Sequence, residues 1–388
     1  MTAMKICYIY SLQWSAPDAH MTNLLSNCEA LSTEGHTVCL LTPFGRKSVI
    51  EERFHLYGVA KNFKVRRMAC PEPKNYGTIG MFLRGAFCAQ ALAAVFIIKP
   101  DAIYTSDFSM LYFLSRVPGF LRPGVLVIFE AHKVYSGAAQ LRRVSEKQEI
   151  AAMKAADRVV CISNGVKRDL IALGYPEEKL YVLPNAVDLS KFNVRRQDGR
   201  GTHNIVYTGS FLYWKGVDIL VDAFALLLKQ MPDTKLYLVG DDYEGNRQKL
   251  ATQIKELGIE KSVEMTGYVS QKEVARYLGI ADVAVLPNRV TVEGANYTSP
   301  SKIFEYMAAR VPIVASDLPS IREILDEETA VLVPPDDAKA LCDGMLRLLK
   351  NPSIGRDLAD KAYERVRSNY TWDMRARKIV KIIEKIKG

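Results

Sequence analysis

The chain has 388 residues with a mean hydropathy of −0.03, and 48% of the residues are hydrophobic and 24% charged. This composition excludes a disordered protein, a collagen and a disulfide-stapled small domain, and the length predicts two or three domains. The net charge is +9, with a surplus of +6 in residues 1–190 and +3 in residues 191–388.

The cysteines and histidines indicate neither a disulfide framework nor a metal site. The seven cysteines form no C-x-x-C pair, which predicts reduced, buried thiols of a cytosolic protein. The five histidines show no metal-ligand spacing, so no zinc site is expected.

The first half of the chain alternates short apolar runs with helical stretches. Strands are predicted at 5–10, 38–41, 102–105, 125–130, 158–163 and 180–184, with a helix at 20–34. Strands separated by helices predict parallel pairing, with helices on both faces of the sheet. The N-terminus is typical of a strand rather than a secretory leader. The longest apolar run, 86–98, is shorter than the roughly 20 residues that span a bilayer, so a soluble or membrane-surface protein is expected.

Five bases and no acid lie between Arg53 and Pro71. A solvated loop would explain this stretch, and so would an anionic partner such as a membrane, a lipid pyrophosphate or a nucleic acid. No nucleic-acid-binding motif accompanies it, so nucleic acid is not expected as a partner.

A polar stretch at 193–203 predicts a linker, after which the alternation of strands and helices begins again. Strands are predicted at 204–208, 235–239, 263–266, 283–286 and 313–315, and helices at 217–230, 246–257, 272–278, 301–309, 338–349 and 372–387. The expected fold class is α/β, with two doubly wound domains. The ligand site is expected in the cleft between them, at the carboxyl ends of the strands.

The segment 207–216 places Gly209, Ser210, Lys215 and Gly216 between a predicted strand and a predicted helix. Glycine allows the backbone to approach a ligand, a helix start presents N–H groups, and Lys215 adds a positive charge. These features predict a diphosphate site, although a purely structural connection would look the same. The segment is not a P-loop, because G-x-x-x-x-G-K-[ST] is absent.

The segment 298–308 carries a second, stronger cluster of polar residues. Ser299 is predicted to cap a helix that begins with Pro300. Ser301 and Lys302 then offer N–H groups, a hydroxyl and a charge to an anion. Glu305 follows one turn after Ser301, where its carboxylate can accept hydrogen bonds from the vicinal hydroxyls of a ribose. A capped helix with a surface lysine and glutamate is the structural alternative.

With these motifs in this order, the chain resembles the family-4 retaining glycosyltransferases (glycosyl transferases group 1) of the GT-B fold. The matching stretches are 35–38, 130–132, 161–164 and 183–188 in the first half, and 209–216, 238–241, 263–269, 281–287 and 299–316 in the second. The resemblance implies two Rossmann-like domains that face each other across a cleft. Residues 1–192 would form the acceptor-binding domain, to which helix 372–388 crosses back, and residues 203–371 the domain that binds the nucleotide-sugar donor.

The resemblance also implies roles for single residues. It assigns the donor to Gly209, Ser210, Lys215, Tyr268, Val269, Tyr297, Ser299, Pro300, Ser301, Lys302 and Glu305, with Lys215 at the diphosphate, Tyr268 and Val269 at the base, and Glu305 at the ribose. His132 matches a histidine beside the donor sugar. No cofactor is implied beyond the co-substrate, for which a UDP-sugar is the default. No metal is needed where lysines and helix N-termini stabilise the departing diphosphate.

Two positions depart from the family pattern. Ser210 stands where the family often has an arginine, and Tyr297 stands where the first glutamate of its E-x7-E motif falls. We hypothesise that Lys302 replaces the missing charge at the phosphates, and that Glu293 reaches the sugar in a catalytic role.

The acceptor is expected on the N-terminal domain. Asp18 and His20, at the start of the first helix, are predicted to contact it, although an ordinary strand–helix connection explains them equally well. The bases at 61–67 and the apolar residues at 81–87 suit an anionic membrane surface, so a lipid-linked or cell-surface glycan acceptor is expected. This predicts a cytoplasmic enzyme, with peripheral attachment to the cytoplasmic membrane face as a further hypothesis.

Other functions stay open at this point. A sugar-nucleotide epimerase shares the fold, and a glycoside phosphorylase would require pyridoxal phosphate. Ser210 and Tyr297 make a nucleotide-sugar-binding protein with impaired catalysis conceivable. A dehydrogenase is disfavoured, because no G-x-G-x-x-G follows a strand.

Overall fold

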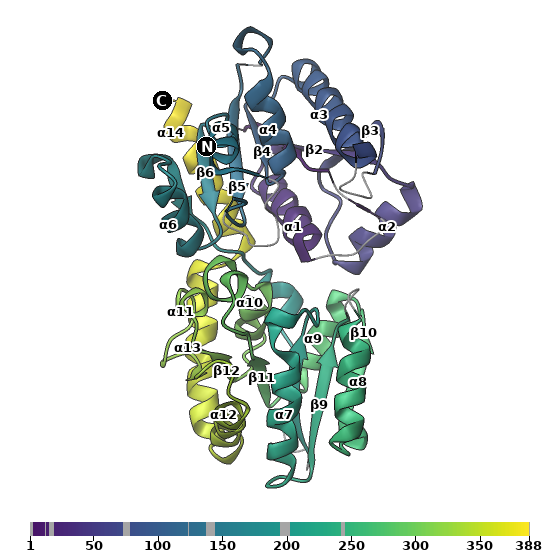
Figure 1. Cartoon of the computed structure of the whole chain (residues 1–388), viewed down its shortest axis with the longest axis vertical. Helices are drawn as coiled ribbons and strands as arrows, with labels where there is room; N and C mark the ends of the chain where they lie inside the picture. Colours follow the sequence, from purple (N-terminus) through teal and green to yellow (C-terminus); the bar gives the residue numbers. More distant parts are fainter. Residues whose placement is uncertain are drawn as a thin grey trace. The chain divides into compact units, whose positions relative to one another are not determined.

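The computed structural model describes residues 3–11, 13–14, 19–72, 78–122, 124–136, 144–194, 202–241 and 245–387. The chain divides into two compact units, Met1–Pro184 with Trp372–Gly388 (unit 1) and Asn185–Thr371 (unit 2). Each unit is a parallel sheet between helices, as the alternation of apolar runs and amphipathic stretches predicts (Figure 1).

The sheet of unit 1 has the order β3-β2-β1-β4-β5-β6-β7, and the neighbouring strands pair in parallel. Its strands are β1 Lys5–Ile9, β2 Thr37–Phe44, β3 Lys64–Pro71, β4 Ala102–Thr105, β5 Leu126–Ala131, β6 Arg158–Cys161 and β7 Leu180–Val182. Its helices are α1 Ala19–Thr33, α2 Lys47–Leu56, α3 Thr78–Ile98, α4 Phe108–Arg116, α5 Glu146–Met153, α6 Asn164–Ala172 and α14 Trp372–Lys387. The strand order reverses beside β1, which is where ligands bind in sheets of this kind.

The acid-free stretch from Arg53 to Pro71 is not a loop. It runs from the end of α2 into the edge strand β3, which the sequence analysis missed because its exposed bases hide the strand pattern. Three of the five bases have partners: Lys61 pairs with Glu51, the buried Arg53 donates to the carbonyl oxygen of Trp14 at 3.0 Å, and Arg67 donates to the carbonyl oxygen of Gly45 at 3.1 Å. The exposed Lys64, Arg66 and Arg67 on β3 carry the charge that remains for a partner.

Helix α3 is longer than the apolar run at 86–98, because its first turns precede that run. Its 21 residues are long and apolar enough, by length and composition only, to cross a membrane, and a third of the most apolar window is buried inside the protein. One face of α3 is that of a core helix. Phe87, Ala91 and Val95 on this face are buried, and α3 packs against β3.

The sheet of unit 2 has the order β10-β9-β8-β11-β12-β13, again with parallel neighbours. Its strands are β8 His203–Thr208, β9 Thr234–Val239, β10 Val263–Gly267, β11 Val283–Leu286, β12 Ile313–Ser316 and β13 Val331–Val333. Its helices are α7 Val217–Leu228, α8 Asn246–Glu256, α9 Gln271–Gly279, α10 Ser301–Ala308, α11 Pro319–Arg322, α12 Ala338–Lys350 and α13 Pro352–Asn369. The strand order reverses beside β8, so the carboxyl ends of β8 and β11 mark the expected site.

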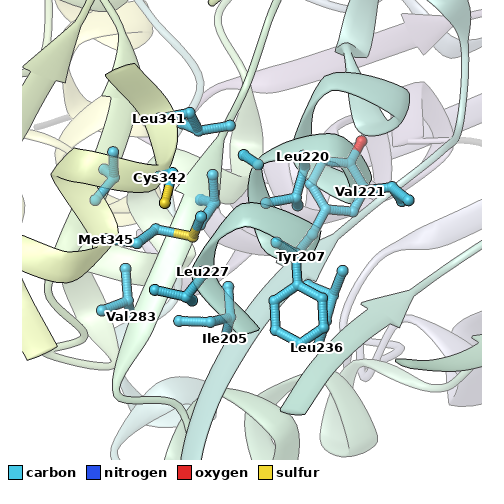
Figure 2. Close-up of a cluster of buried hydrophobic side chains, with 14 of the residues drawn as sticks. Ile205, Tyr207, Leu220, Val221, Leu227, Leu236, Val283, Leu341, Cys342 and Met345 are labelled. Atoms are coloured by element: carbon cyan, nitrogen blue, oxygen red, sulfur yellow. The ribbon is translucent and has the colours of Figure 1, made fainter. Parts of the chain in front are cut away.

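One side of the unit 2 sheet is covered by α7 and α12, which pack against each other. Figure 2 shows Leu220 and Leu227 of α7 and Met345 of α12 beside Ile205 of β8 in this apolar cluster. The helix predicted at 217–230 therefore forms with one apolar face buried, and this face anchors the helix whose first residue follows Gly216.

The division between the units lies before the predicted linker. Val187 and Phe192 are buried in the core of unit 2, and Val187 forms a bridge with Thr371, so the chain enters unit 2 at Asn185 rather than after residue 192. The C-terminal helix α14 belongs to unit 1, where it packs against α1. All seven cysteines are free and buried, as predicted.

Candidate functional site

The turn after β8 is built around glycines with positive φ, a conformation that other residues rarely adopt. Gly216 has φ +65°, and a Cβ there would overlap the carbonyl oxygen of Pro287. Gly209 has φ +117°, and a Cβ there would lie 3.0 Å from the Nζ of Lys302. The turn therefore brings the backbone at Gly209 close to the amine of Lys302, whereas its predicted role as a diphosphate site stays a prediction.

Gly240, which follows β9, packs directly against the backbone of this turn at Gly209. Its φ is +144°, and a Cβ would overlap the carbonyl group of Gly209. We expect Gly240→Ala to lower the free energy of unfolding by at least about 1–3 kcal/mol, since it adds steric overlap to an unfavourable φ. Gly258→Ala is the matched control, because Gly258 also has positive φ (+67°) but open space around it. Urea unfolding of both variants tests this, and an equal loss in the two would contradict the overlap.

Lys215 ends the short helical turn Tyr213–Lys215 and is 9% exposed. Its Nζ lies 3.6 Å from the centre of the Trp214 ring. Burial lowers the pKa of Lys215 to about 7, so the amine is held ready to take a proton when an anion approaches.

Lys302 lies in the first turn of α10 and is 7% exposed. Its Nζ lies 3.7 Å from the centre of the Tyr207 ring and has no hydrogen-bond partner among the described residues. Burial, together with the charge of Lys215, lowers the pKa of Lys302 well below its usual range. The two amines therefore share one site, where an anion would relieve their mutual repulsion.

Glu305 lies one turn further along α10 and is half-buried. Burial raises the pKa of Glu305 to about 7, against the lowering influence of Lys302 and of a hydrogen bond from Gln271. A carboxyl group whose pKa lies near 7 suits recognition of hydroxyl groups, because it can accept or donate a hydrogen bond.

Ser299 is not the cap of α10, contrary to the prediction. The helix begins at Ser301, its N-cap is Pro300, and no side chain caps it. The Oγ of Ser299 instead accepts from the backbone N–H of Asn185 at 2.9 Å, and the side chain of Asn185 donates to the carbonyl oxygen of Ser299 at 2.6 Å. Asn185 thus fixes the segment that leads into the helix.

The other predicted donor residues occupy varied surroundings. Tyr297 is 7% exposed, and Tyr268, just after β10, is 46% exposed. The backbone carbonyl of Ser210 accepts from the hydroxyl of Tyr207 at 2.6 Å. Val269 packs against the core of unit 2. Glu293 lies in the helical turn Glu293–Tyr297, and its side chain lies outside the described part of the structure.

In unit 1, His132 follows β5 and is held by Glu130. The Nε2 of His132 lies 2.9 Å from Oε1 of Glu130, and the other carboxylate oxygen accepts from Arg375 of α14 at 2.8 Å and from the hydroxyl of Tyr104. Burial alone would raise the pKa of Glu130, but the Arg375 charge and the hydrogen bonds from His132 and Tyr104 outweigh it and hold this pKa well below its usual range. Glu130 is therefore an anion that orients the His132 ring.

His20, one of the two predicted acceptor residues, lies in α1 beside His132. The ring centres of His20 and His132 are 4.6 Å apart, edge to face, and the Nε2 of His20 lies 3.0 Å from Oγ of Ser106. Asp18, the other predicted acceptor residue, lies outside the described residues.

Sequence reasoning missed several residues of these clusters. The hydroxyl oxygen of Tyr306 accepts from the backbone N–H of Thr208, at the end of β8, at 2.9 Å. Asn288, two residues after β11, is fully buried, and neither polar atom of its amide has a partner among the described residues. Asn288 could have been found from the sequence, because a polar residue soon after the end of a parallel strand indicates a ligand site. Arg375 had no such signal, because its partner Glu130 is 245 residues away.

Comparison with known proteins connects both halves to one group of enzymes. The family described as "Glycosyltransferase Family 4" matches residues 22–191, and the family described as "Glycosyl transferases group 1" matches residues 202–351. The chain is 24% identical over 360 residues to the amylovoran biosynthesis glycosyltransferase AmsK of Erwinia amylovora, covering 88% of each chain. It is 31% identical over 219 residues to the phosphatidyl-myo-inositol mannosyltransferase of Mycobacterium tuberculosis, covering 53% of this chain and 54% of that one.

Among solved structures, the chain is similar to Anabaena Alr3699/HepE in complex with UDP-glucose, with a TM-score of 0.75 and 16% identity over 98% of this chain and all of that one. At this identity the likeness establishes the fold, two Rossmann-like domains of the GT-B type. Both halves match, in the predicted order, and the curated relatives are sugar transferases. The chain belongs to the group 1, family 4 glycosyltransferases.

Proposed function

We propose that this glycosyltransferase moves a sugar from a nucleotide-diphosphate sugar, with a UDP-sugar as donor, to a lipid-linked or glycan acceptor, with retention of the anomeric configuration. The observation that carries the donor proposal is the pair of buried amines, Lys215 and Lys302, at the glycine turn after β8 and the uncapped start of α10. A diphosphate supplies the charge that these amines lack.

The reaction breaks the bond between the anomeric carbon and the phosphate oxygen, and negative charge builds on the departing diphosphate. Lys215, Lys302 and the N–H groups at the start of α10 stabilise that charge. In this proposal the amines stabilise the charge of the leaving group without a metal. The sugar ring becomes positively charged in the transition state, and the acceptor hydroxyl attacks from the face that the phosphate leaves and passes its proton to the phosphate oxygen.

The remaining roles are those that the family resemblance implies, and the geometry supports them. Glu305 takes the ribose hydroxyls, because its carboxyl lies one turn from the phosphate end of α10. The exposed ring of Tyr268 offers a stacking surface to the base. In the acceptor unit, His132 is assigned to the sugar, with its ring fixed by Glu130.

The acceptor is assigned to unit 1, and the enzyme to the cytoplasm, at the cytoplasmic face of a membrane. Supporting this are the exposed bases of β3, the exposed apolar residues of α3 and the lipid acceptor named for the mycobacterial relative.

The purified protein incubated with UDP-, GDP- and ADP-sugars tests the donor. Thermal unfolding should reveal binding of the correct nucleotide, which stabilises by about 2.7 kcal/mol at 100 times its dissociation constant. Donor consumption in the presence of EDTA tests metal independence, and NMR of the product tests retention. Failure of every nucleotide sugar to bind would overturn the proposal. Binding without transfer to any acceptor or to water would favour a nucleotide-sugar-binding protein.

Nucleotide binding is expected to take up protons. The pKa of Lys215 lies near 7 in the empty site, so above pH 7 the amine is mostly neutral, and a diphosphate that pairs with it must raise the pKa. UDP affinity should therefore fall as the pH rises above about 7. Calorimetry of UDP binding in buffers of different ionisation enthalpy measures the uptake. Lys215→Met should reduce it, while Lys255→Met, at an exposed position of α8, should leave it unchanged.

A further inference from the structure

A large groove opens in unit 1 between the ends of β2 and β3 and the start of α3. Its volume is about 990 Å³, at the upper end of what ligand pockets enclose. Its lining is mostly apolar and includes Phe44, Val49, Cys70, Pro71, Ile79 and Leu83. We call it the β2–β3 groove. Its size and lining suit a long apolar group rather than a sugar.

The apolar character continues from the groove onto the surface. Ile79, Met81 and Phe82, in the first turns of α3, have exposed fractions of 78%, 66% and 74%. Ile79 also lines the groove, so the outer face and the groove form one apolar surface. Exposed large apolar side chains next to each other indicate a contact with an apolar partner.

Charge at the groove favours an anion at its mouth. Arg46 lines the groove and is exposed. The guanidinium carbon of Arg67 lies 5.4 Å from the centre of the Phe44 ring, and Arg67 donates to the carbonyl oxygen of Gly45 at 3.1 Å. Glu72, an acid of the lining, accepts from the backbone N–H of Trp14 at 3.2 Å. Two arginines against one carboxylate leave a net positive charge near the groove, which favours a phosphate there.

The groove lies at the functional edge of the sheet. Because the strands of unit 1 are parallel, the carboxyl ends of β2 and β3 share an edge with the end of β5, after which His132 follows. A ligand whose apolar chain fills the groove would thus have its polar end on the side of the sheet where His20 and His132 lie.

We propose that the β2–β3 groove binds the hydrocarbon chain of a phosphate-linked lipid acceptor, with Arg46 and Arg67 at the phosphate and the exposed face of α3 against the membrane that supplies the lipid. The proposal rests on the proposed function only in calling this lipid the acceptor. The groove takes one chain, and the bases select lipids whose headgroup begins with a phosphate.

Calorimetry with farnesyl phosphate tests the groove without any donor sugar. Farnesyl phosphate should bind at least about tenfold more tightly than farnesol, which lacks the charge, and than inorganic phosphate, which lacks the chain. Ala69→Trp, which fills the groove from its exposed position on β3, should weaken binding of farnesyl phosphate by at least about tenfold. Arg46→Gln should weaken farnesyl phosphate but not farnesol.

Ile97→Ser is the control, because Ile97 is 71% exposed on α3 but does not line the groove. It should leave farnesyl phosphate binding unchanged, and UDP binding should be unchanged in all variants. Equal affinity for farnesyl phosphate and inorganic phosphate, or unaltered binding by Ala69→Trp, would overturn the proposal. So would a dimer that Phe82→Ser dissociates, since a second copy would then cover this face. Transfer of sugar to a water-soluble acceptor without farnesyl phosphate binding would leave the glycosyltransferase function standing and reject the groove.

Discussion

Lys302→Met is expected to lower the rate of sugar transfer by about 10²–10³, equivalent to roughly 2.7–4 kcal/mol of transition-state stabilisation. The Nζ of Lys302 is buried, has no hydrogen-bond partner among the described residues, and shares its site with Lys215. Such an amine costs stability in the empty protein and is useful only when an anion forms beside it. The methionine side chain has similar bulk, so the fold should be as stable as before, or more stable.

Steady-state kinetics with saturating donor, together with urea unfolding, measure the two expected effects of Lys302→Met. The matched control is Lys255→Met on the exposed surface of α8, which should change neither quantity. A variant that keeps more than about a third of the wild-type rate would show that Lys302 does not act on the leaving group. Loss of stability with intact rate would assign it a structural role.

Arg375→Met is expected to lower the free energy of unfolding of unit 1 by about 3–5 kcal/mol, because it leaves the buried carboxylate of Glu130 without its counter-charge. Arg377→Met is the control on the same helix. Arg377 is half-exposed and pairs with Glu34 at 2.8 Å, so its loss should cost less than about 1 kcal/mol.

The loss of unfolding free energy in Arg375→Met should depend on pH. In the wild type the pKa of Glu130 lies below its usual range, so its contribution to stability is present at neutral pH and is lost only in strong acid. In Arg375→Met, burial is unopposed by that charge and raises the pKa of Glu130. The difference in free energy of unfolding between the wild type and Arg375→Met should therefore be largest at neutral pH. It should shrink as the pH falls and Glu130 is protonated. Adding Glu130→Gln to Arg375→Met should recover part of the loss, and no recovery would contradict the pairing.

The fold and the cluster of glycines, lysines and Glu305 after β8 and on α10 could be predicted from the sequence because their signals are local. The turn at Gly209 to Gly216 and the helix start at Ser301 are continuous segments whose residue types carry their own geometry. Strands separated by amphipathic helices likewise specify parallel sheets. The order of these motifs along the chain is by itself specific enough to indicate the family.

Other features depend on tertiary contacts and could not be predicted. Edge strand β3 carries three exposed bases in four positions, which hides the alternation of a half-buried strand. Ser299 has the sequence of a helix cap but is taken by Asn185, 114 residues away. The anionic partner of His132 was visible in sequence as Glu130, whereas its burial and its pairing with Arg375 were not.

The assignment of α14 to unit 1 has a consequence for biosynthesis. Unit 1 begins with the first residues of the chain but is completed by the last, whose Ile379, Val380 and Ile383 are buried and whose helix packs against α1. Until those residues leave the ribosome, the partner surface on α1 is uncovered and Glu130 lacks Arg375. Unit 2 has all of its residues earlier. Unit 1 is thus begun first but completed last, and a prematurely terminated chain would contain a finished unit 2 attached to an unfinished unit 1.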